Sequence, residues 1–309
     1  MMNTMLSFYP VTVQSLDVLK NGLPMDGNGD CNMSVASLIT RAKERELEYA
    51  CLVGRLVLRW RPAAKSPMVW VWPSDCDLCP TLMHELEAQS RAMGEPLRIY
   101  GTLPYLEERF KATWPERQYT LTTSEDWGDY LYSREALVKL EGRKLAGKRN
   151  FVKRYRKQHP DAQFLPLNAG TIPLARTFLE SWYAEHQPLD ESMQAEADAI
   201  AIAFDHFSAL GLRGGVLVEN GVVHGFTYGA MLTEQMFAVH IEKADRTITG
   251  AYPALASFFA ASLPEQYEII NREEDLGIPG LRKAKEDWNP LGRLEKGYIT
   301  VIPEGGAQA

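Results

Sequence analysis

The stretch YEIINREEDLGIPGLRKAKEDWNP, residues 267–290, places a short β-like segment directly before a dense set of charged side chains. The polar run 271–275 follows the segment, and a turn bracketed by glycines then leads to a second basic cluster. A strand that runs into polar residues is a common way for α/β folds to build a site, because the strand is rigid and the loop beyond it is free to vary. The alternative is a solvated loop whose surface ion pairs contribute little to stability.

Length and composition describe a globular protein. The 309 residues are 45% hydrophobic and 24% charged, which predicts one large or two ordinary domains with a sizeable core. The formal net charge of -7 argues against a generally basic nucleic-acid binder and leaves room only for a local basic patch. We find neither an apolar run of bilayer-spanning length nor a secretory signal, and we therefore expect a cytoplasmic protein.

The four cysteines are too few for a disulfide framework in a chain of this length. Cys76 and Cys79 have the spacing of a zinc knuckle or a redox pair, but the sequence contains no second such pair. Since a structural zinc site takes four ligands, we predict reduced thiols here and no metal site.

Two successive halves of the sequence alternate between helical and β-like segments. In the second half, helices are expected at 172–186, 196–210 and 252–263, and strands at 215–219, 222–232, 236–241, 267–271 and 298–302. Asn220-Gly221 predicts a tight hairpin between the first two strands. The first half shows a shorter version of the same order, in which the Ala-, Leu-, Lys- and Glu-rich residues 35–50 are expected to be helical.

A hairpin that leads into a central strand, a helix and another strand is the arrangement of GNAT-type N-acyltransferases, whose two central strands splay apart to admit an activated acyl donor. By this analogy we predict an α/β (α+β) fold of two tandem GNAT-like domains with mixed, splayed central sheets. The expected domains are residues 1–125 and 126–309.

The second domain begins with a basic segment, residues 134–157, which holds ten Lys or Arg residues and two Glu. Leu137, Leu140, Leu145, Val152 and Tyr155 are expected to form a buried stripe that leaves the basic residues outward. A nucleic acid such as a tRNA acceptor stem would be bound through its phosphates, and the candidate contacts are Lys148, Arg149, Lys153 and Arg154. The alternative is a solvated linker helix.

Three segments carry a family resemblance: YLYSREALVKLEGRKLAGKRNFVKRYRKQHP (130–160), HIEKADRTITGAYPAL (240–255) and NREEDLGIPGLRKAKEDWNP (271–290). They resemble the DUF2156 family, which is similar to the C-terminal domain of phosphatidylglycerol lysyltransferases and, more distantly, to the Fem aminoacyltransferases. The resemblance implies a tandem GNAT-like transferase that moves an aminoacyl group from a charged tRNA to an amine or hydroxyl of a lipid or peptide.

The sequence departs from the related enzymes in two ways. It lacks the membrane-spanning half of the lysyltransferases, so a lipid acceptor would have to be reached by peripheral contact. The turn that binds pyrophosphate in acyl-CoA enzymes is replaced by Arg246-Thr-Ile-Thr-Gly250-Ala251, which has a single glycine. The turn therefore does not favour coenzyme A binding, although Thr247, Thr249 and backbone amides could hold another phosphate.

Candidate site residues follow the central strand and its neighbour. We expect His240 and Glu242 to lie on one face of the strand by alternation, with either as the catalytic base, and Asp275 beyond the next strand as a third catalytic group. The predicted substrate-binding residues are Lys243, Asp245, Thr249, Gly250, Asn271, Arg272, Glu273, Arg282 and Lys283. The alternatives are a core role for His240, a Glu242–Lys243 ion pair, and a salt-bridge network joining the domains.

The sequence thus predicts an acyl- or aminoacyltransferase without a firmly assigned cofactor, whose donor is a charged tRNA or an acyl-CoA and whose acceptor is undetermined. The alternative is a non-catalytic module that binds a ligand or RNA on the same scaffold.

Overall fold

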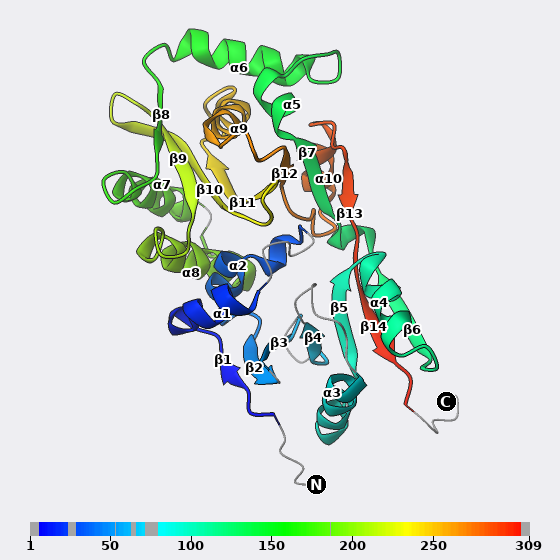
Figure 1. Cartoon of the computed structure of the whole chain (residues 1–309). Coiled ribbons are helices and arrows are strands. Elements are labelled where there is room, and N and C mark those ends of the chain that lie inside the picture. The colour runs from blue at the N-terminus through cyan, green and yellow to red at the C-terminus, as the bar shows by residue number, and fades with distance from the viewer. Residues whose placement is uncertain are drawn as a thin grey trace. The chain divides into compact units, whose positions relative to one another are not determined.

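The computed structural model describes residues 6–23, 29–52, 54–62, 66–71, 80–185 and 187–303. Cys76 and Cys79 lie outside these ranges. The chain divides into two compact units, residues 1–128 with 294–309, and residues 129–293. Each unit is built on a seven-stranded sheet that mixes parallel and antiparallel pairs, with helices against it (Figure 1). The predicted α/β class with two mixed central sheets is confirmed.

The first unit has the strand order β1-β2-β3-β4-β5-β14-β6. Its strands are β1 (Tyr9–Pro10), β2 (Glu48–Leu52), β3 (Arg55–Trp60), β4 (Val69–Val71), β5 (Arg98–Thr102), β6 (Tyr119–Thr123) and β14 (Lys296–Val301). Its helices are α1 (Leu16–Gly22), α2 (Val35–Thr40), α3 (Pro80–Ala92) and α4 (Tyr105–Thr113). The core between sheet and helices is centred on Trp70, Ile99, Phe110 and Ile299.

The second unit has the strand order β13-β7-β12-β11-β10-β9-β8. Its strands are β7 (Asp129–Ser133), β8 (Gln163–Pro166), β9 (Arg213–Glu219), β10 (Val222–Met231), β11 (Met236–Ala244), β12 (Ile269–Asn271) and β13 (Gly292–Leu294). Its helices are α5 (Arg134–Lys139), α6 (Ala146–Gln158), α7 (Ile172–Ala184), α8 (Glu191–Asp205), α9 (Ala251–Ser262) and α10 (Pro279–Glu286). Helix α9 packs on β10 and β11, α6 packs on α9, and α7 packs on β10 (Figure 1).

The two sheets share one pairing pattern. Three antiparallel steps lead to a single parallel step, β4–β5 in the first sheet and β11–β12 in the second, and an antiparallel strand follows. That following strand is β14 in the first sheet and β7 in the second. The strand expected at 298–302 therefore forms, but it belongs to the sheet of the first unit and not to that of the C-terminal domain. Its backbone bonds to β5 and β6 on both sides decide this placement.

Two predicted helices differ from the observed ones for local reasons. The helix expected at 196–210 is α8, which begins five residues earlier because the Asp190 carboxylate accepts the backbone N–H of Met193 and caps its first turn. The helix expected at 35–50 ends at Thr40, and its last residues enter β2 instead. There Tyr49 and Cys51 pair with β3, so the sheet overrides the helix propensity of the segment.

Candidate functional site

The central strands of the second unit part after a short parallel contact. β11 and β12 pair only through Met236–Ile269, Phe237–Ile270 and Ala238–Asn271, whereas β11 continues to Ala244. The polar residues after β12 therefore start at the point where the two strands stop sharing hydrogen bonds. Because β12 ends here, the charged groups that follow Val239 and Ile270 contact each other directly beyond the last shared pair.

A β-bulge in β11 falls on His240. Tyr228 of β10 pairs with Ile241, but the next residue, Gly229, pairs with Val239, which leaves His240 as the extra residue. A bulge bends the strand and re-aims side chains. Gly229 makes it possible, because a Cβ at this position would collide with the carbonyl oxygen of Ala238.

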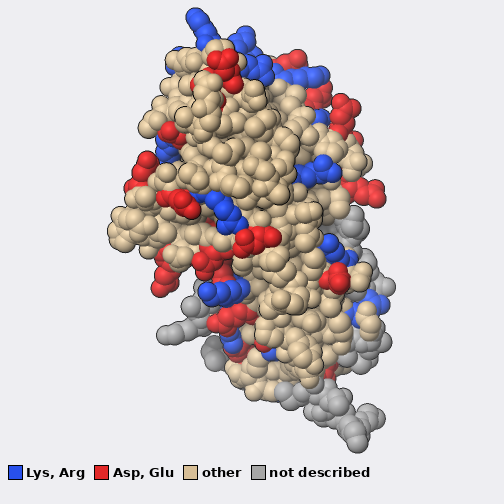
Figure 2. All heavy atoms as spheres, turned by 90° about the vertical axis from the view of Figure 1, so that its left-hand side faces the viewer, with Lys and Arg blue, Asp and Glu red and all other residues tan. Residues whose placement is uncertain are grey.

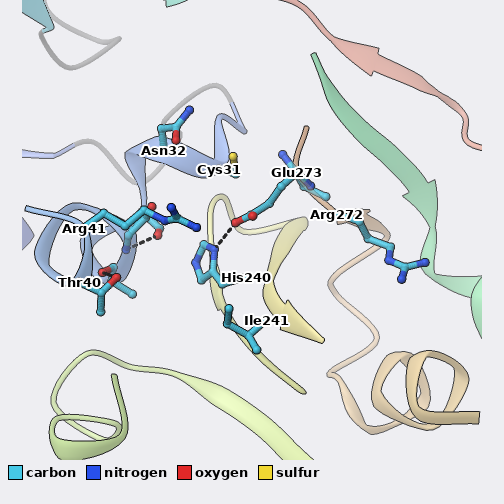
Figure 3. Close-up of polar contacts among 12 residues, drawn as sticks. Cys31, Asn32, Thr40, Arg41, His240, Ile241, Arg272 and Glu273 are labelled. Carbon is cyan, nitrogen blue, oxygen red and sulfur yellow. Dashed lines mark hydrogen bonds and ion pairs between the residues drawn. The ribbon is translucent and has the colours of Figure 1, made fainter. Parts of the chain in front are cut away.

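His240 contacts Glu273 across the opening. Its Nδ1 lies 2.7 Å from Glu273 Oε1, and its side chain is only 10% exposed (Figure 3). When the carboxylate accepts the Nδ1–H, the lone pair of the neutral imidazole is on Nε2, which is the tautomer of a general base. His240 therefore has the hydrogen-bonding arrangement of a carboxylate-oriented catalytic histidine.

The backbone of Glu273 is held in an unusual conformation. Its φ is 60°, in the left-handed region that non-glycine residues rarely adopt. Asn271 Oδ1 accepts the Glu273 N–H at 2.7 Å, and the Glu273 carbonyl accepts from the backbone N–H of Tyr130. The Lys285 ammonium donates to the carbonyls of residues 272, 273 and 274. Strain of this kind persists only where surrounding contacts enforce it, and it is frequent at functional sites.

Glu242 does not share a face with His240, contrary to the prediction. Its carboxylate lies 2.7 Å from Arg272, whose guanidinium also stacks over the rings of Tyr132 and Trp288. Arg272 and Glu273 point in opposite directions from adjacent positions (Figure 3). The bulge shifts the alternation of β11 by one residue, and this places Glu242 apart from His240. With its carboxylate engaged by Arg272, Glu242 is better suited to positioning than to proton transfer.

Asp275 is fully buried and completely engaged. Its carboxylate accepts two hydrogen bonds from Arg282 at 2.8 and 3.0 Å, one from the Tyr130 hydroxyl at 2.7 Å and one from the backbone N–H of Gly277. The bonds from Arg282, with those from Tyr130 and Gly277, hold the pKa of Asp275 well below its usual range despite its burial. Burial and the bond to Asp275 raise the pKa of Tyr130 to about 12. A carboxylate in this state is a weak base, so the geometry favours a positioning role.

Lys243 contacts neither Arg272 nor Glu273 and lies instead against α7 and α8. It pairs with Glu196 of α8 at 2.7 Å, and its ammonium lies 3.6 Å from the ring centre of Trp182 on α7. Burial lowers the pKa of Lys243. The ion pair considered between Glu242 and Lys243 is therefore wrong, since each residue has another partner on its own face of the sheet.

The turn before α9 offers a limited phosphate site. The Asp245 carboxylate accepts from the backbone N–H and the hydroxyl of Thr247, and Thr249 is exposed. Gly250, with a φ of 87°, lies directly beneath α6, and a Cβ there would be 2.5 Å from the carbonyl oxygen of Phe151. Because α6 packs this closely on the first turn of α9, the open backbone cradle of the acyl-CoA enzymes is not observed here.

The basic segment folds into α5, a turn and α6, and its predicted apolar stripe is buried in full. Lys153 and Arg154 are exposed on α6, and Figure 2 shows Lys and Arg side chains gathered at the end of the second unit where α6 lies. Arg149 instead donates to the carbonyls of Leu140 and Gly142 and closes the end of α5. Lys148 lies over the ring of Trp288, and burial lowers its pKa.

Sequence reasoning missed several residues of the site. Lys285 was visible as part of a basic cluster, but its three carbonyl contacts depend on how α10 folds back on the loop. Tyr130 donates a hydrogen bond to Asp275, and Trp288 stacks against Arg272. In the sequence, both aromatic residues look like ordinary core residues. Lys283, predicted to bind substrate, pairs with Asp287 on the exposed side of α10.

Helices of the described residues do not reach the length and apolarity required to cross a membrane. Curated proteins yield no match to the chain.

Solved structures with the same fold include a conserved protein of unknown function from Bacteroides thetaiotaomicron, which is 30% identical and covers 96% of this chain and 100% of its own, with a TM-score of 0.86. Two others are 14% identical, and each covers 93% of this chain and 91% of its own. One is the C-terminal domain (DUF2156) of a protein named as a lysylphosphatidylglycerol synthetase from Agrobacterium fabrum, with a TM-score of 0.62. The other is L-PGS from Bacillus licheniformis, with a TM-score of 0.63.

The family described as "Phosphatidylglycerol lysyltransferase, C-terminal" matches residues 27–299. This match covers most of both units, and the predicted resemblance to DUF2156 is confirmed. The chain belongs to the family of the C-terminal domain of phosphatidylglycerol lysyltransferases.

Proposed function

We propose that this protein transfers an aminoacyl group from a charged tRNA to an amine or hydroxyl acceptor, with His240 as the general base. The single observation that carries the proposal is the pair of His240 with Glu273, 2.7 Å apart, on a bulge where β11 and β12 part. Family membership supports acyl or aminoacyl transfer as the class of reaction.

The reaction would proceed by direct attack of the acceptor on the ester. The acceptor N–H or O–H gives its proton to His240 Nε2 as its heavy atom forms a bond to the ester carbonyl carbon. The bond between that carbon and the tRNA 3′-oxygen then breaks, and His240 returns the proton to this oxygen. Glu273 accepts the Nδ1–H throughout and stabilises the imidazolium, as carboxylates do in other catalytic dyads and triads.

Two features support a charged tRNA over an acyl-CoA as donor. Lys153 and Arg154 lie on the exposed side of α6, and no acidic partner contacts either of them among the described residues. The turn at Gly250 is covered by α6 and carries one glycine, so it lacks the pyrophosphate cradle of acyl-CoA enzymes. Phosphate contacts on α6 would give tRNA binding a strong salt dependence.

Transfer assays with a panel of tRNAs charged with radiolabelled amino acids test the proposal. The acceptors are phosphatidylglycerol vesicles, which probe peripheral lipid contact, and soluble amines, and acyl-CoAs form a separate donor arm. We expect one charged tRNA to be consumed and kcat to fall about 10²–10⁴-fold in His240→Gln. His206→Gln, on the C-terminal end of α8, is the matched control.

The proposal fails if no charged tRNA is turned over faster than without protein, or if His240→Gln retains full activity. If only acyl-CoA is turned over, the donor is an acyl-CoA and not a charged tRNA. Salt-dependent binding of tRNA without any transfer would favour the alternative of an RNA-binding module, which the exposed Lys153 and Arg154 also support.

A further inference from the structure

A second histidine cluster lies in the same unit, between α6, β9 and β10. It consists of His159 after α6, Glu219 at the end of β9 and His224 in β10. His159 Nδ1 is 2.7 Å from Glu219 Oε2, and His224 Nε2 is 3.9 Å from the same oxygen. One ligand atom from each of the three residues lies within 4.8 Å of the other two.

His224, like His240, is the extra residue of a β-bulge. Val223 pairs with Val218 of β9, but Gly225 pairs with Leu217, so that His224 has no partner in the register. The bulge aims an almost fully buried imidazole at a carboxylate, and a bulge that re-aims a side chain is common beside functional sites.

Tyr155 fixes the orientation of this imidazole. Its hydroxyl oxygen lies 2.6 Å from His224 Nδ1, which leaves Nε2 as the nitrogen that faces Glu219. Histidines that bind metals usually use their second ring nitrogen in such a hydrogen bond, which sets the tautomer and the ring orientation.

We propose that His159, Glu219 and His224 bind a divalent zinc-class ion, with the Tyr155 hydroxyl as the group that orients His224. Two imidazole nitrogens and a carboxylate oxygen are ligands that Zn²⁺ accepts, and with bonds near 2.1 Å in a tetrahedral site the ligand atoms would be about 3.4 Å apart. The observed distances of 2.7 and 3.9 Å from Glu219 Oε2 bracket that spacing, and all three ligand atoms lie within 4.8 Å of one another.

The site is open on one side. His159 is 23% and Glu219 16% exposed, which gives an ion an entry route and leaves a coordination position for water or another ligand. The bound ion would join the C-terminal end of the basic helix α6 to the hairpin of β9 and β10. This proposal does not depend on the transferase reaction.

Metal titration of the purified full chain tests the site directly. We expect one Zn²⁺ to bind, and Co²⁺ to give the intense visible absorption of four-coordinate cobalt. Glu219→Gln and His159→Gln should weaken Zn²⁺ binding by about 100-fold or more, whereas Tyr155→Phe should weaken it about tenfold, since it removes only the orienting hydrogen bond. His206→Gln should bind as the unmodified protein does.

Thermal unfolding provides a second readout. Zn²⁺ should raise the Tm of the unmodified protein and leave that of His159→Gln unchanged, because a ligand stabilises only the state that binds it. His159 is partly exposed, so this variant should fold even if substitutions at buried His224 do not. Equal Zn²⁺ affinity in the unmodified protein and Glu219→Gln, or a thiolate–cobalt charge-transfer band that shows binding at cysteines, would overturn the proposal.

Discussion

The two sheets of this protein share a pairing order but differ in how regular their strands are. In the first sheet, the described pairings of β2 with β3 and of β3 with β4 run without a register shift. In the second sheet, β10 is irregular against both neighbours, and the extra residues are His224 and His240. The parallel step of the first sheet joins Trp70 and Ile99, which are fully buried, whereas that of the second leads into Asn271 and the charged loop.

The same strand order therefore supports an apolar core in one sheet and a polar cluster in the other. In a regular strand, side chains alternate between two faces, and the β4–β5 step of the first sheet fills its inner face with apolar residues. A bulge interrupts the alternation and turns a polar side chain toward a neighbouring element. Both irregular positions of β10 have a glycine beside the bulge, Gly225 and Gly229, where a Cβ would meet the backbone of β11.

The largest expected effect comes from removing the glycine that permits the His240 bulge. Gly229→Ala should lower the free energy of unfolding by about 3 kcal/mol, because the new methyl group would collide with the Ala238 carbonyl and the backbone would have to move. Urea unfolding followed by circular dichroism measures the change.

The matched control for this variant is Gly280→Ala in α10, where no atom lies within 4 Å of the new methyl group. It should leave stability unchanged or raise it by up to about 1 kcal/mol. The prediction is wrong if Gly229→Ala is as stable as this control and keeps its transferase activity. The bulge at His240 would then not depend on Gly229, and it would not explain the difference between the two sheets.

Asp275→Asn should have the next largest effect, about 2 kcal/mol, because Arg282 and Tyr130 lose a charged acceptor in a buried position. The pKa of Asp275 is lowered from its ordinary 3.8 in the folded state, so its ionised form stabilises the fold fully above that value. This contribution is lost as the pH falls below about 4 toward the folded pKa.

Chemical unfolding of both proteins between pH 7 and pH 3 checks this prediction. The stability difference between the unmodified protein and Asp275→Asn should be constant near neutrality and shrink in acid. A difference that does not change with pH would show that the bonds of Asp275 contribute to the fold independently of its charge.

Lys285→Met should destabilise the protein by about 1 kcal/mol, since three loop carbonyls lose their ammonium donor. Its effect on transfer should fall on kcat more than on KM, because the loop positions Glu273 and through it His240. Steady-state assays with the donor identified for the unmodified protein separate the two constants. An unchanged kcat would mean that the strained backbone of Glu273 does not depend on Lys285.

The smallest effect on stability is expected from Lys153→Gln combined with Arg154→Gln, within about 0.5 kcal/mol, because both side chains are exposed. The plot of log affinity for charged tRNA against log salt should lose about 0.8 in slope for each charge removed. Filter binding at several salt concentrations measures the slope. Lys43→Gln combined with Lys111→Gln in the first unit is the control. An equal loss of slope in this control would show that tRNA does not bind α6 in preference to the first unit.

Much of the fold was predictable from the sequence because its signals are local. Asn220-Gly221 predicts the hairpin of β9 and β10, and runs of β-branched and aromatic residues predict most strands within a few residues. The charged run after Ile270 marked the loop whose side chains contact His240 and Glu242, and the stripe of α5 and α6 followed from helical spacing. The prediction that His240 and Glu242 share one face was wrong because of the bulge at His240. A bulge depends on pairing with the neighbouring strand, so the sequence of the bulged strand does not reveal it.

Most elements, the family and the stretch of chain that holds the polar cluster could be inferred from the residues, because propensity, periodicity and motif length are properties of neighbouring residues. Three features required the folded chain: β14 joins the first sheet, Glu273 rather than Glu242 contacts His240, and His159 and His224 converge on Glu219. Each of these depends on which strand pairs with which and in what register, and hydrogen bonds between residues far apart in the chain set that choice.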